Sequence, residues 1–460
     1  MWACSDRCLS SRRRAGPDRA PDRPHILGRV RKGPFRHRWF NLFVGSVGLG
    51  SIGSEVAHLA MPLLVLDLTQ SLGAAALLRV VQMVPYVFFG ALAGALIDRV
   101  DKRRLLIVCD VLSAGLMTIV PLSVTLGAFS LELLYVVAFL LGTVEVLWGV
   151  TADFSVLPSL VEEHELTAAN AAYLGADRGA RVIGPLLGGT TIAALGGGVA
   201  ADAAALWIAA IAYLPTFVVF LRMPPLLERS QVTASLTPAN VAREVGQGFS
   251  FIWRSPILRA LCVLMFVSNL GGVGIQTLLL FVLKVEQGLD AATIGLALSL
   301  TGVLTIAGSV GAPLLARGRP LGQTMLGVVT FAALASVAAA FARDWRLLVA
   351  AVAARQTAWA AHIVYVFVPR QREVPASLRG RVNGSFRTII LIANASSPAL
   401  LSWIQAVAGT PAAFSVAGAC MAVAVGVTYF SPLRAYDIRE TASQVERAEG
   451  PAEVEATAAD

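Results

Sequence analysis

Ionisable side chains lie within apolar runs of this sequence, where a charge is costly. Glu55 and His58 are three residues apart in one run, Glu145 lies in another, and Arg181 follows Asp177 by one helical turn in a third. A charged side chain at the centre of a bilayer costs about 2.5–3.5 kcal/mol, so such groups usually face a cavity or one another. A carboxylate in that setting can bind and release a proton, or it can hold a cationic ligand.

The depths of these groups follow from the turn that joins two of the runs. The runs that carry Glu145 and Arg181 are antiparallel about a turn near Glu163, and the two residues are about equally far from it along the chain. Glu55 lies at a comparable depth in its own run. We therefore expect Glu55, Glu145 and Arg181 to form a polar cluster on a central cavity. The alternative is a static ion pair that only fixes helix packing.

The second half of the chain carries fewer such groups. Arg355 and His362 are seven residues apart on one helical face, and Arg387 lies about two turns into the next run. The excess of buried Arg over carboxylate would suit a substrate with some anionic character. Four further side chains are candidates for the lining of a cavity, with ordinary packing as the alternative: Trp148, Phe266, Asn269 and Trp359.

Twelve apolar runs must position these residues. The chain has 460 residues, of which 56% are hydrophobic and 14% charged, which excludes an ordinary soluble enzyme. About 20 residues cross the ~30 Å hydrocarbon core of a bilayer as a helix. The expected spans are 39–66, 75–97, 105–127, 131–157, 167–195, 199–221, 257–283, 292–315, 321–342, 346–368, 379–406 and 411–431.

The distribution of charge predicts how these spans are oriented. Basic residues crowd the first 38 residues and alternate loops, whereas the loops at 69–73, 126–131 and 196–201 contain no Lys or Arg. The positive-inside rule places the basic loops and both termini in the cytosol. The formal net charge of +8 then reflects membrane topology, and we expect no nucleic acid partner.

The longest internal loop divides the chain into two halves of six helices. The expected parts are a disordered basic cytosolic tail (1–38), a first bundle (39–221), a cytosolic linker (222–256), a second bundle (257–431) and a cytosolic C-terminal tail (432–460). Pro238 after Thr237 predicts the start of an amphipathic helix in the linker. A weak internal repeat supports the division, because Asn170 and Pro185 have the same spacing as Asn383 and Pro398.

A dense group of charges joins the second and third apolar runs. Its pattern is Gly94-x-x-x-Asp98-Arg99-x-x-Lys102-Arg103-Arg104. It is similar to the signature loop of the major facilitator superfamily. Three other stretches resemble the branch of that superfamily that holds enterobactin exporters and macrolide-efflux proteins, and the resemblance covers about residues 36–432. They are Leu157-Pro158…Leu166-Thr-Ala-Ala-Asn170, Phe251-Ile-Trp253…Pro256…Ala260 and Val374-Pro375…Arg379-Gly380-Arg381-Val-Asn383.

The resemblance implies an all-α membrane protein with twelve transmembrane helices in two pseudo-symmetric six-helix bundles. It further implies a secondary active transporter that exports an amphipathic small molecule (a drug, a macrolide or a siderophore) by proton antiport and alternating access. Asp98 would then hold the cytosolic side shut against Arg379 and Arg381 at the start of the eleventh helix. Gly94 would allow close approach there, and Asp110 would orient Arg99 or Arg103.

A further stretch resembles the core of a motif associated with antiporters of this superfamily. It is Gly184-Pro185-Leu-Leu-Gly188-Gly189, with Ala180 where the motif has a glycine. Small residues let a neighbouring helix approach, and a proline permits a bend. Generic small-residue packing is the alternative.

The sequence contains no metal-ligand spacing, nucleophile elbow or nucleotide-binding loop. We therefore expect no enzyme activity, no metal and no cofactor, with transport driven by the proton gradient. The expected protein is a monomer in the plasma membrane, with a small molecule, protons and lipid as its partners. Two alternatives stay open, a solute importer of the same fold and a transport-inactive membrane sensor or scaffold.

Overall fold

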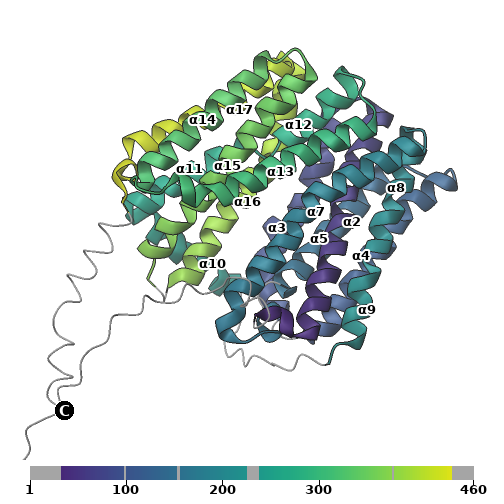
Figure 1. Cartoon of the computed structure of the whole chain (residues 1–460), viewed down its shortest axis with the longest axis horizontal. Coiled ribbons are helices and arrows are strands. Elements are labelled where there is room, and N and C mark those ends of the chain that lie inside the picture. The colour runs from purple at the N-terminus through teal and green to yellow at the C-terminus, as the bar shows by residue number, and fades with distance from the viewer. Residues whose placement is uncertain (1–32, 98–99, 153–155, 225–237, 376–377, 438–460) are drawn as a thin grey trace, which may run out of the picture.

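The chain is described by a computed structural model over residues 33–97, 100–152, 156–224, 238–375 and 378–437, and the elements in these ranges are helices (Figure 1). Those of the first half are η2 (Pro34–Arg36), α2 (Arg38–Thr69), α3 (Leu72–Ile97), α4 (Lys102–Thr125), α5 (Leu131–Thr151), α6 (Leu157–Ser159), η4 (Glu163–Glu165), α7 (Leu166–Ala194), α8 (Gly198–Ala212) and α9 (Leu214–Arg222). Those that follow are α10 (Pro238–Arg254), α11 (Pro256–Leu270), α12 (Ile275–Phe281), the π-helical turn η5 (Val282–Glu286), α13 (Ala291–Leu315), α14 (Leu321–Phe341), α15 (Trp345–Glu373), α16 (Arg379–Ala408), α17 (Thr410–Phe430) and η7 (Pro432–Ala435).

Within the described ranges, ten helical segments are long and apolar enough to cross a membrane. Two of these segments include more than one element: Gly198–Arg222 covers α8 and α9, and Pro256–Glu286 covers α11, α12 and η5. The predicted spans at 75–97 and 167–195 fall on α3 and α7, which are not among the ten. The side chains of α3 are described only as far as Phe88, and α7 carries three charged residues: Asp177, Arg178 and Arg181.

Several helices begin where a polar side chain caps the first turn. The side chains of Ser130, Asp290 and Asp344 accept hydrogen bonds from backbone N–H groups at the starts of α5, α13 and α15. Such a cap satisfies a donor that has no partner within the helix. These polar residues therefore separate apolar segments that would otherwise continue into one another.

The predicted span at 257–283 is interrupted in the structure. α11 ends at Leu270, and the chain turns through residues 271–274 before α12 begins. The backbone N–H of Gly274 donates to the Ser397 hydroxyl of α16 at 2.8 Å, so it is satisfied outside its own helix. Three glycines in four positions (Gly271, Gly272 and Gly274) remove the side chains that would obstruct this turn.

The helices of the two halves gather on opposite sides of the molecule (Figure 1). We call the end that carries Arg38, Arg222 and Phe430 the near end, and the opposite end, with Thr69 and Ala291, the far end. At the near end each half has its own apolar core, around Phe43, Leu106 and Phe220 in the first half and Leu258, Tyr365 and Phe386 in the second. At the far end one continuous core includes α2, α5 and α8 together with α12 and α13. The two halves are therefore joined at the far end.

The weak sequence repeat corresponds to matching contacts. In the first half, Gly184 of α7 directly precedes Pro185, and a Cβ on Gly184 would overlap Glu55 of α2. In the second half, a Cβ on Gly274 would meet the backbone of Ser397 and Pro398 of α16 at 2.8–2.9 Å. Each proline of the repeat thus lies at or beside a close contact, of α7 with α2 in the first half and of α16 with the turn before α12 in the second.

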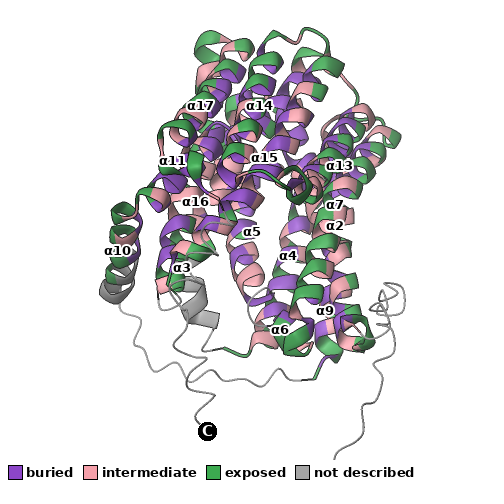
Figure 2. Cartoon of the chain, turned by 60° about the vertical axis from the view of Figure 1, so that its left-hand side comes forward, coloured by how far each residue is buried: buried purple, intermediate pink, exposed green. Residues whose placement is uncertain are grey.

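The linker helix α10 begins at Pro238, as predicted, and packs against α16 (Figure 2). A Cβ on Gly248 would overlap the Arg381 carbonyl and the Ser385 side chain, which shows how closely the helices approach. Phe249 and Trp253 stack with their ring centroids 5.6 Å apart and are 44% and 51% exposed. Aromatic side chains exposed beside the near end suit a helix that lies at a membrane surface.

Candidate functional site

Glu55 of α2 is the centre of a polar cluster in the first half. Its carboxylate oxygens lie 3.9 Å from Arg181 Nε of α7 and 3.8 Å from His58 Nδ1 one turn along α2. Arg181 Nε also lies 3.4 Å from the Asp177 carboxylate. The structure thus brings together Glu55, His58, Asp177 and Arg181. The Glu55 side chain is 14% exposed, whereas the Arg181 side chain is 51% exposed and can reach an open space.

Glu145 of α5 has a different partner from the one predicted. Tyr86 of α3 donates its hydroxyl to Glu145 Oε2 at 3.2 Å, and the structure gives no direct contact between Glu145 and Arg181. The charge of Arg79 of α3 acts on both carboxylates, although its guanidinium donates a hydrogen bond to Gln82 and not to Glu55 or Glu145. Arg79 was not predicted from the sequence. It is an ionisable residue within an apolar run, so the criterion that selects Glu55 selects it as well.

The antiporter-like stretch places this cluster against the second half. Gly184 and Gly188 pack on α2, at Glu55 and Val56 respectively. Gly189 faces the other way, where a Cβ would overlap the Ala291 carbonyl of α13, and a Cβ on Gly295 would likewise overlap the Pro185 carbonyl. We call this line of contact between α7 and α13 the seam.

The seam continues from the far end to the level of the polar cluster. A Cβ on Gly302 of α13 would lie 3.1 Å from the carbonyl of Arg181. Arg181 is therefore part of the contact between the halves as well as the partner of Glu55.

Part of the predicted gating loop lies outside the described residues. This holds for Asp98 and Arg99, and of Gly94 only its place in α3 is described. Lys102 begins α4, and the Asp101 side chain caps that helix by accepting from the backbone N–H of Arg104.

Asp110 was predicted to orient Arg99 or Arg103. Arg99 lies outside the described residues, and for Arg103 the prediction is wrong. Asp110 is buried and accepts a hydrogen bond from Trp148 Nε1 at 3.0 Å. Arg103 donates to the carbonyls of Phe220 and Leu221 at 2.6 and 2.7 Å. These carbonyls lie at the C-terminal end of α9, where unpaired carbonyls and the helix dipole favour a cation. Trp148 therefore interacts with α4, and Arg103 ties α4 to α9.

The cations proposed to receive Asp98 lie at the start of α16. Arg379 Nε donates to the Val374 carbonyl at 3.3 Å, and both Arg379 and Arg381 are exposed. No described acidic side chain pairs with either of them. They remain candidates for a contact with the first half when the near end closes.

The predicted residues of the second half are mostly buried. Arg355 donates to Gln356, while its Nε and Nη2, the Trp359 indole nitrogen and both His362 ring nitrogens have no partner among the described residues. Asn269 is buried and donates to the Met265 carbonyl, and Arg387 is exposed. Because Arg355, Trp359 and His362 share one face of α15, the structure groups their unsatisfied polar atoms within this half.

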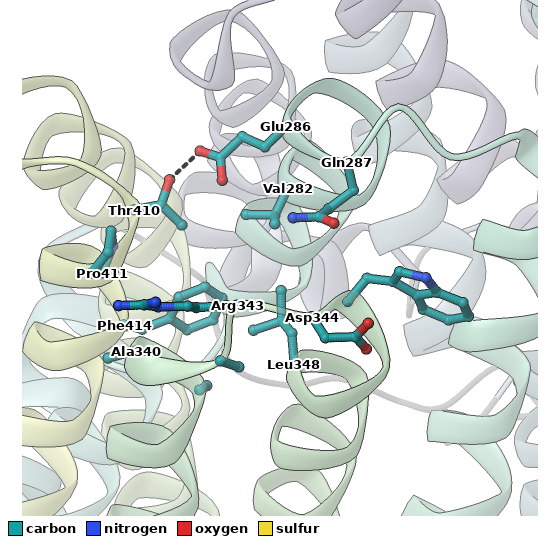
Figure 3. Close-up of a pocket in the computed structure, with 13 residues that line it drawn as sticks. Val282, Glu286, Gln287, Ala340, Arg343, Asp344, Leu348, Thr410, Pro411 and Phe414 are labelled. Atoms are coloured by element: carbon teal, nitrogen blue, oxygen red, sulfur yellow. Dashed lines mark hydrogen bonds between the residues drawn. The ribbon is translucent and has the colours of Figure 1, made fainter.

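A small cavity at the far end does not coincide with any predicted site. It has a volume of about 90 Å³ and lies between η5, α14, α15 and α17 (Figure 3). Glu286 accepts a hydrogen bond from Thr410 at its rim. Sites for drug-sized ligands have volumes of about 300–1,000 Å³, so this cavity is too small for one. Among the described residues, no group of three His, Cys, Asp or Glu side chains is placed to hold a metal ion.

A charged cluster ties the start of α2 to the loop before α7. The side chains of Arg36 and His37 both pair with Glu165, and Arg36 also pairs with Glu162. Burial acts to raise the pKa of the Glu165 carboxyl, but the hydrogen bonds from His37 and the Glu162 backbone, with the charge of Arg36, outweigh it and lower the pKa. The cluster stabilises the near end of the first half, and its charges lie outside the membrane-spanning helices.

The described part of the chain is all-helical, with ten candidate membrane spans and a charged cluster among them, and these are the features of a membrane transporter. The family model described as "transmembrane secretion effector" matches residues 31–458, and the chain belongs to this family of the major facilitator superfamily. Its members are membrane transporters and not enzymes.

Two relatives match most of the chain. The multidrug efflux pump Tap of Mycolicibacterium fortuitum is 27% identical over 399 residues, which cover 84% of this chain and 94% of the relative. The enterobactin exporter EntS of Citrobacter koseri is 25% identical over 393 residues, which cover 84% of this chain and 88% of the relative.

The fold is similar to that of solved transporters. A bacterial homologue of the iron transporter ferroportin in its inward-facing state matches with a TM-score of 0.66 at 17% identity, over 85% of this chain and 98% of that chain. In the outward-facing state of such a homologue the TM-score is 0.56, over the same shares of the two chains. At this identity the likeness describes the fold alone.

Proposed function

We propose that this protein exports amphipathic small molecules, such as drugs or siderophores, in exchange for protons that enter the cell. The relatives are a multidrug pump and a siderophore exporter, which supports both the direction and the class of substrate. The observation that carries the proposal is the Glu55–Arg181 pair, because it joins a carboxylate within a membrane helix to the seam between the halves.

The proposed structure has twelve membrane helices in two six-helix bundles, with α3 and α7 as the two spans beyond the ten described above. The distribution of basic residues supports cytosolic termini and a near end that faces the cytosol. The proposed location is the plasma membrane. The far-end core shared by both halves and the separate near-end cores support an inward-facing state.

The proposed cycle is alternating access, in which the two bundles rock about the central site. In the inward-facing state the substrate enters from the cytosol and the Glu55 carboxylate is paired with Arg181. Protonation of Glu55 from outside would weaken that pair and change the contact of Arg181 with Gly302 of α13. A proton can drive the movement only through such a difference in its affinity for the two states.

Transport by purified protein in liposomes tests the proposal. With an imposed proton gradient, we expect movement of a cationic dye such as ethidium against its gradient, coupled to proton movement that a pH-sensitive dye records. Glu55→Gln should abolish the proton movement while dye counterflow, which needs no net proton transfer, continues. Glu163→Gln is the matched control, because Glu163 is exposed and lies outside the membrane helices.

Two results would contradict this proposal, one its direction of transport and the other the role of Glu55 in proton coupling. Dye accumulation in the opposite direction under the same gradient would indicate an importer. Coupled transport by Glu55→Gln at the wild-type rate would show that the Glu55–Arg181 pair is a structural contact, which is the alternative considered for it.

A further inference from the structure

An ion pair crosses between the halves at the far end. Lys284 on the π-helical turn η5 places its Nζ 2.8 Å from Asp67 Oδ1, near the end of α2. Both side chains are largely buried, at 17% and 13% exposure. The pair belongs to the closed far end, where α2 and η5 are in contact. Separation of the halves at this end would break it.

A second carboxyl group lies beside this pair. Asp202 of α8 is fully buried, and no donor among the described residues reaches either of its oxygens. Its side chain lies within hydrogen-bond reach of the Asp67 carboxyl group. The charges that act on it are those of Asp67 and Lys284. Asp67 Oδ2 is buried and unpartnered as well. The other ionisable groups at the far ends of neighbouring elements in the described ranges are Glu132, Tyr135, Glu286, Asp290, Arg343, Asp344 and Arg346.

The charges of this group do not balance when all three members are ionised. Two carboxylates against one ammonium leave a net negative charge in a buried site, which is unfavourable. One added proton makes the group neutral, and it also supplies an O–H donor for the unpartnered carboxylate oxygens. Two close carboxyl groups then share that proton, and it belongs to the pair rather than to either residue.

The surroundings of these three charged groups change when the two halves separate at the far end. Lys284 then leaves Asp67, and water reaches both carboxyl groups, so two negative charges are no longer confined together in a buried site. Closure therefore requires a proton that the open form does not hold. We propose that Asp67 and Asp202 form a proton-binding site at the far end, which takes up one proton as the site closes over Lys284.

The sign of the pH dependence follows from this balance. The closed far end binds one proton more than the open form, so acid favours closure and alkali favours opening. For one proton, the ratio of closed to open forms changes by up to about tenfold per pH unit. This site is separate from the Glu55 cluster, and the inference holds whichever direction the substrate moves.

Spin-label distances across the far end test the proposal. We would place labels at Leu126→Cys and Phe341→Cys, two exposed far-end positions in opposite halves, with Cys4, Cys8 and the partly exposed Cys420 replaced by Ser. Between pH 8.5 and 5.5, the wild-type protein should shift at least tenfold toward the short distance. Asp202→Asn and Asp67→Asn each leave one carboxyl group for Lys284, so both should change less than twofold over this range.

Glu286→Gln is the matched control, because Glu286 lies two residues from Lys284 but bonds to Thr410 within its own half. It should keep the wild-type response. Two independent variants are used so that one misfolded protein, identified by gel filtration, does not decide the result. A wild-type distance distribution that does not change with pH would overturn the inference, as would an Asp202→Asn response equal to that of wild type.

Discussion

Adding a single methyl group at the seam should change which end of the protein is open. In Gly295→Ala, the new Cβ would overlap the carbonyl oxygen of Pro185 and lie 3.1 Å from the Cα of Gly189. Both contacts belong to the other half of the molecule. The substitution therefore obstructs far-end closure without removing any contact within a bundle.

The expected magnitude follows from the cost of overpacking. An added methyl group that forces backbone to move costs about 1–3 kcal/mol. Because the opposing atoms are main-chain atoms of a helix, no side chain can rotate to relieve the overlap. The whole cost then falls on the closed form, and an energy of this size changes the ratio of open to closed far ends by about 5- to 150-fold.

Alkylation of a buried position beside the seam measures this ratio. Ser299 is 4% exposed and one turn from Gly295, so Ser299→Cys should react with a maleimide mainly when the far end opens. Gly295→Ala should raise the alkylation rate within the range above. Gly311→Ala on the same helix is the control, because a Cβ there meets nothing within 4 Å. An unchanged rate in Gly295→Ala, with the control also unchanged, would refute the interpretation of the seam.

Three further predictions concern other parts of the chain. Trp148→Phe removes the donor to buried Asp110 and should lower the free energy of unfolding by about 1–3 kcal/mol, measured by thermal unfolding in detergent. Asp98→Asn should slow transport in liposomes while ligand binding and thermal stability stay close to those of wild type. Because the folded-state pKa of Glu165 is lowered, its stabilisation is present above the unfolded pKa and is lost as pH falls, so the amide protection factors of residues 35–41 should drop below about pH 4.5.

Each of these predictions has a contrary result. Equal unfolding temperatures for Trp148→Phe and wild type would mean that Asp110 is satisfied in another way. Wild-type turnover in Asp98→Asn would remove the proposed contact with Arg379 and Arg381. Glu165→Gln should already lack the acid-dependent loss of protection, and a loss equal to that of wild type would assign the effect to another group.

The apolar runs predicted the helices well because a membrane-spanning helix needs a continuous apolar sequence of fixed minimum length. Hydropathy cannot detect the interruption after Leu270, since the glycines of that turn are compatible with an apolar run. The interruption depends on the hydroxyl of Ser397, which is more than a hundred residues away. Such a contact is a property of the tertiary structure.

Sequence positions gave the depths of the charged residues but not their partners. Glu145 and Arg181 are about equally far from the turn between their helices, yet Glu145 accepts from Tyr86 of α3. Depth follows from counting residues along antiparallel helices, whereas the partner depends on the direction in which each helix faces and on which helix lies beside it. The packing of α3 against α5, which brings Tyr86 there, has no signal in a single sequence.

The seam places a limit on how the protein can vary. At Gly189 and Gly295 the opposing groups are carbonyl oxygens and glycine Cα atoms, so these positions have no side chain that a substitution could shorten. Mutation can only add bulk there, and every addition favours the same open form. Substitutions at the seam can therefore change the balance between the open and closed far end in one direction only, toward the open form. Changes in the opposite direction must arise at positions with side chains to lose or exchange, such as Lys284 and Asp67.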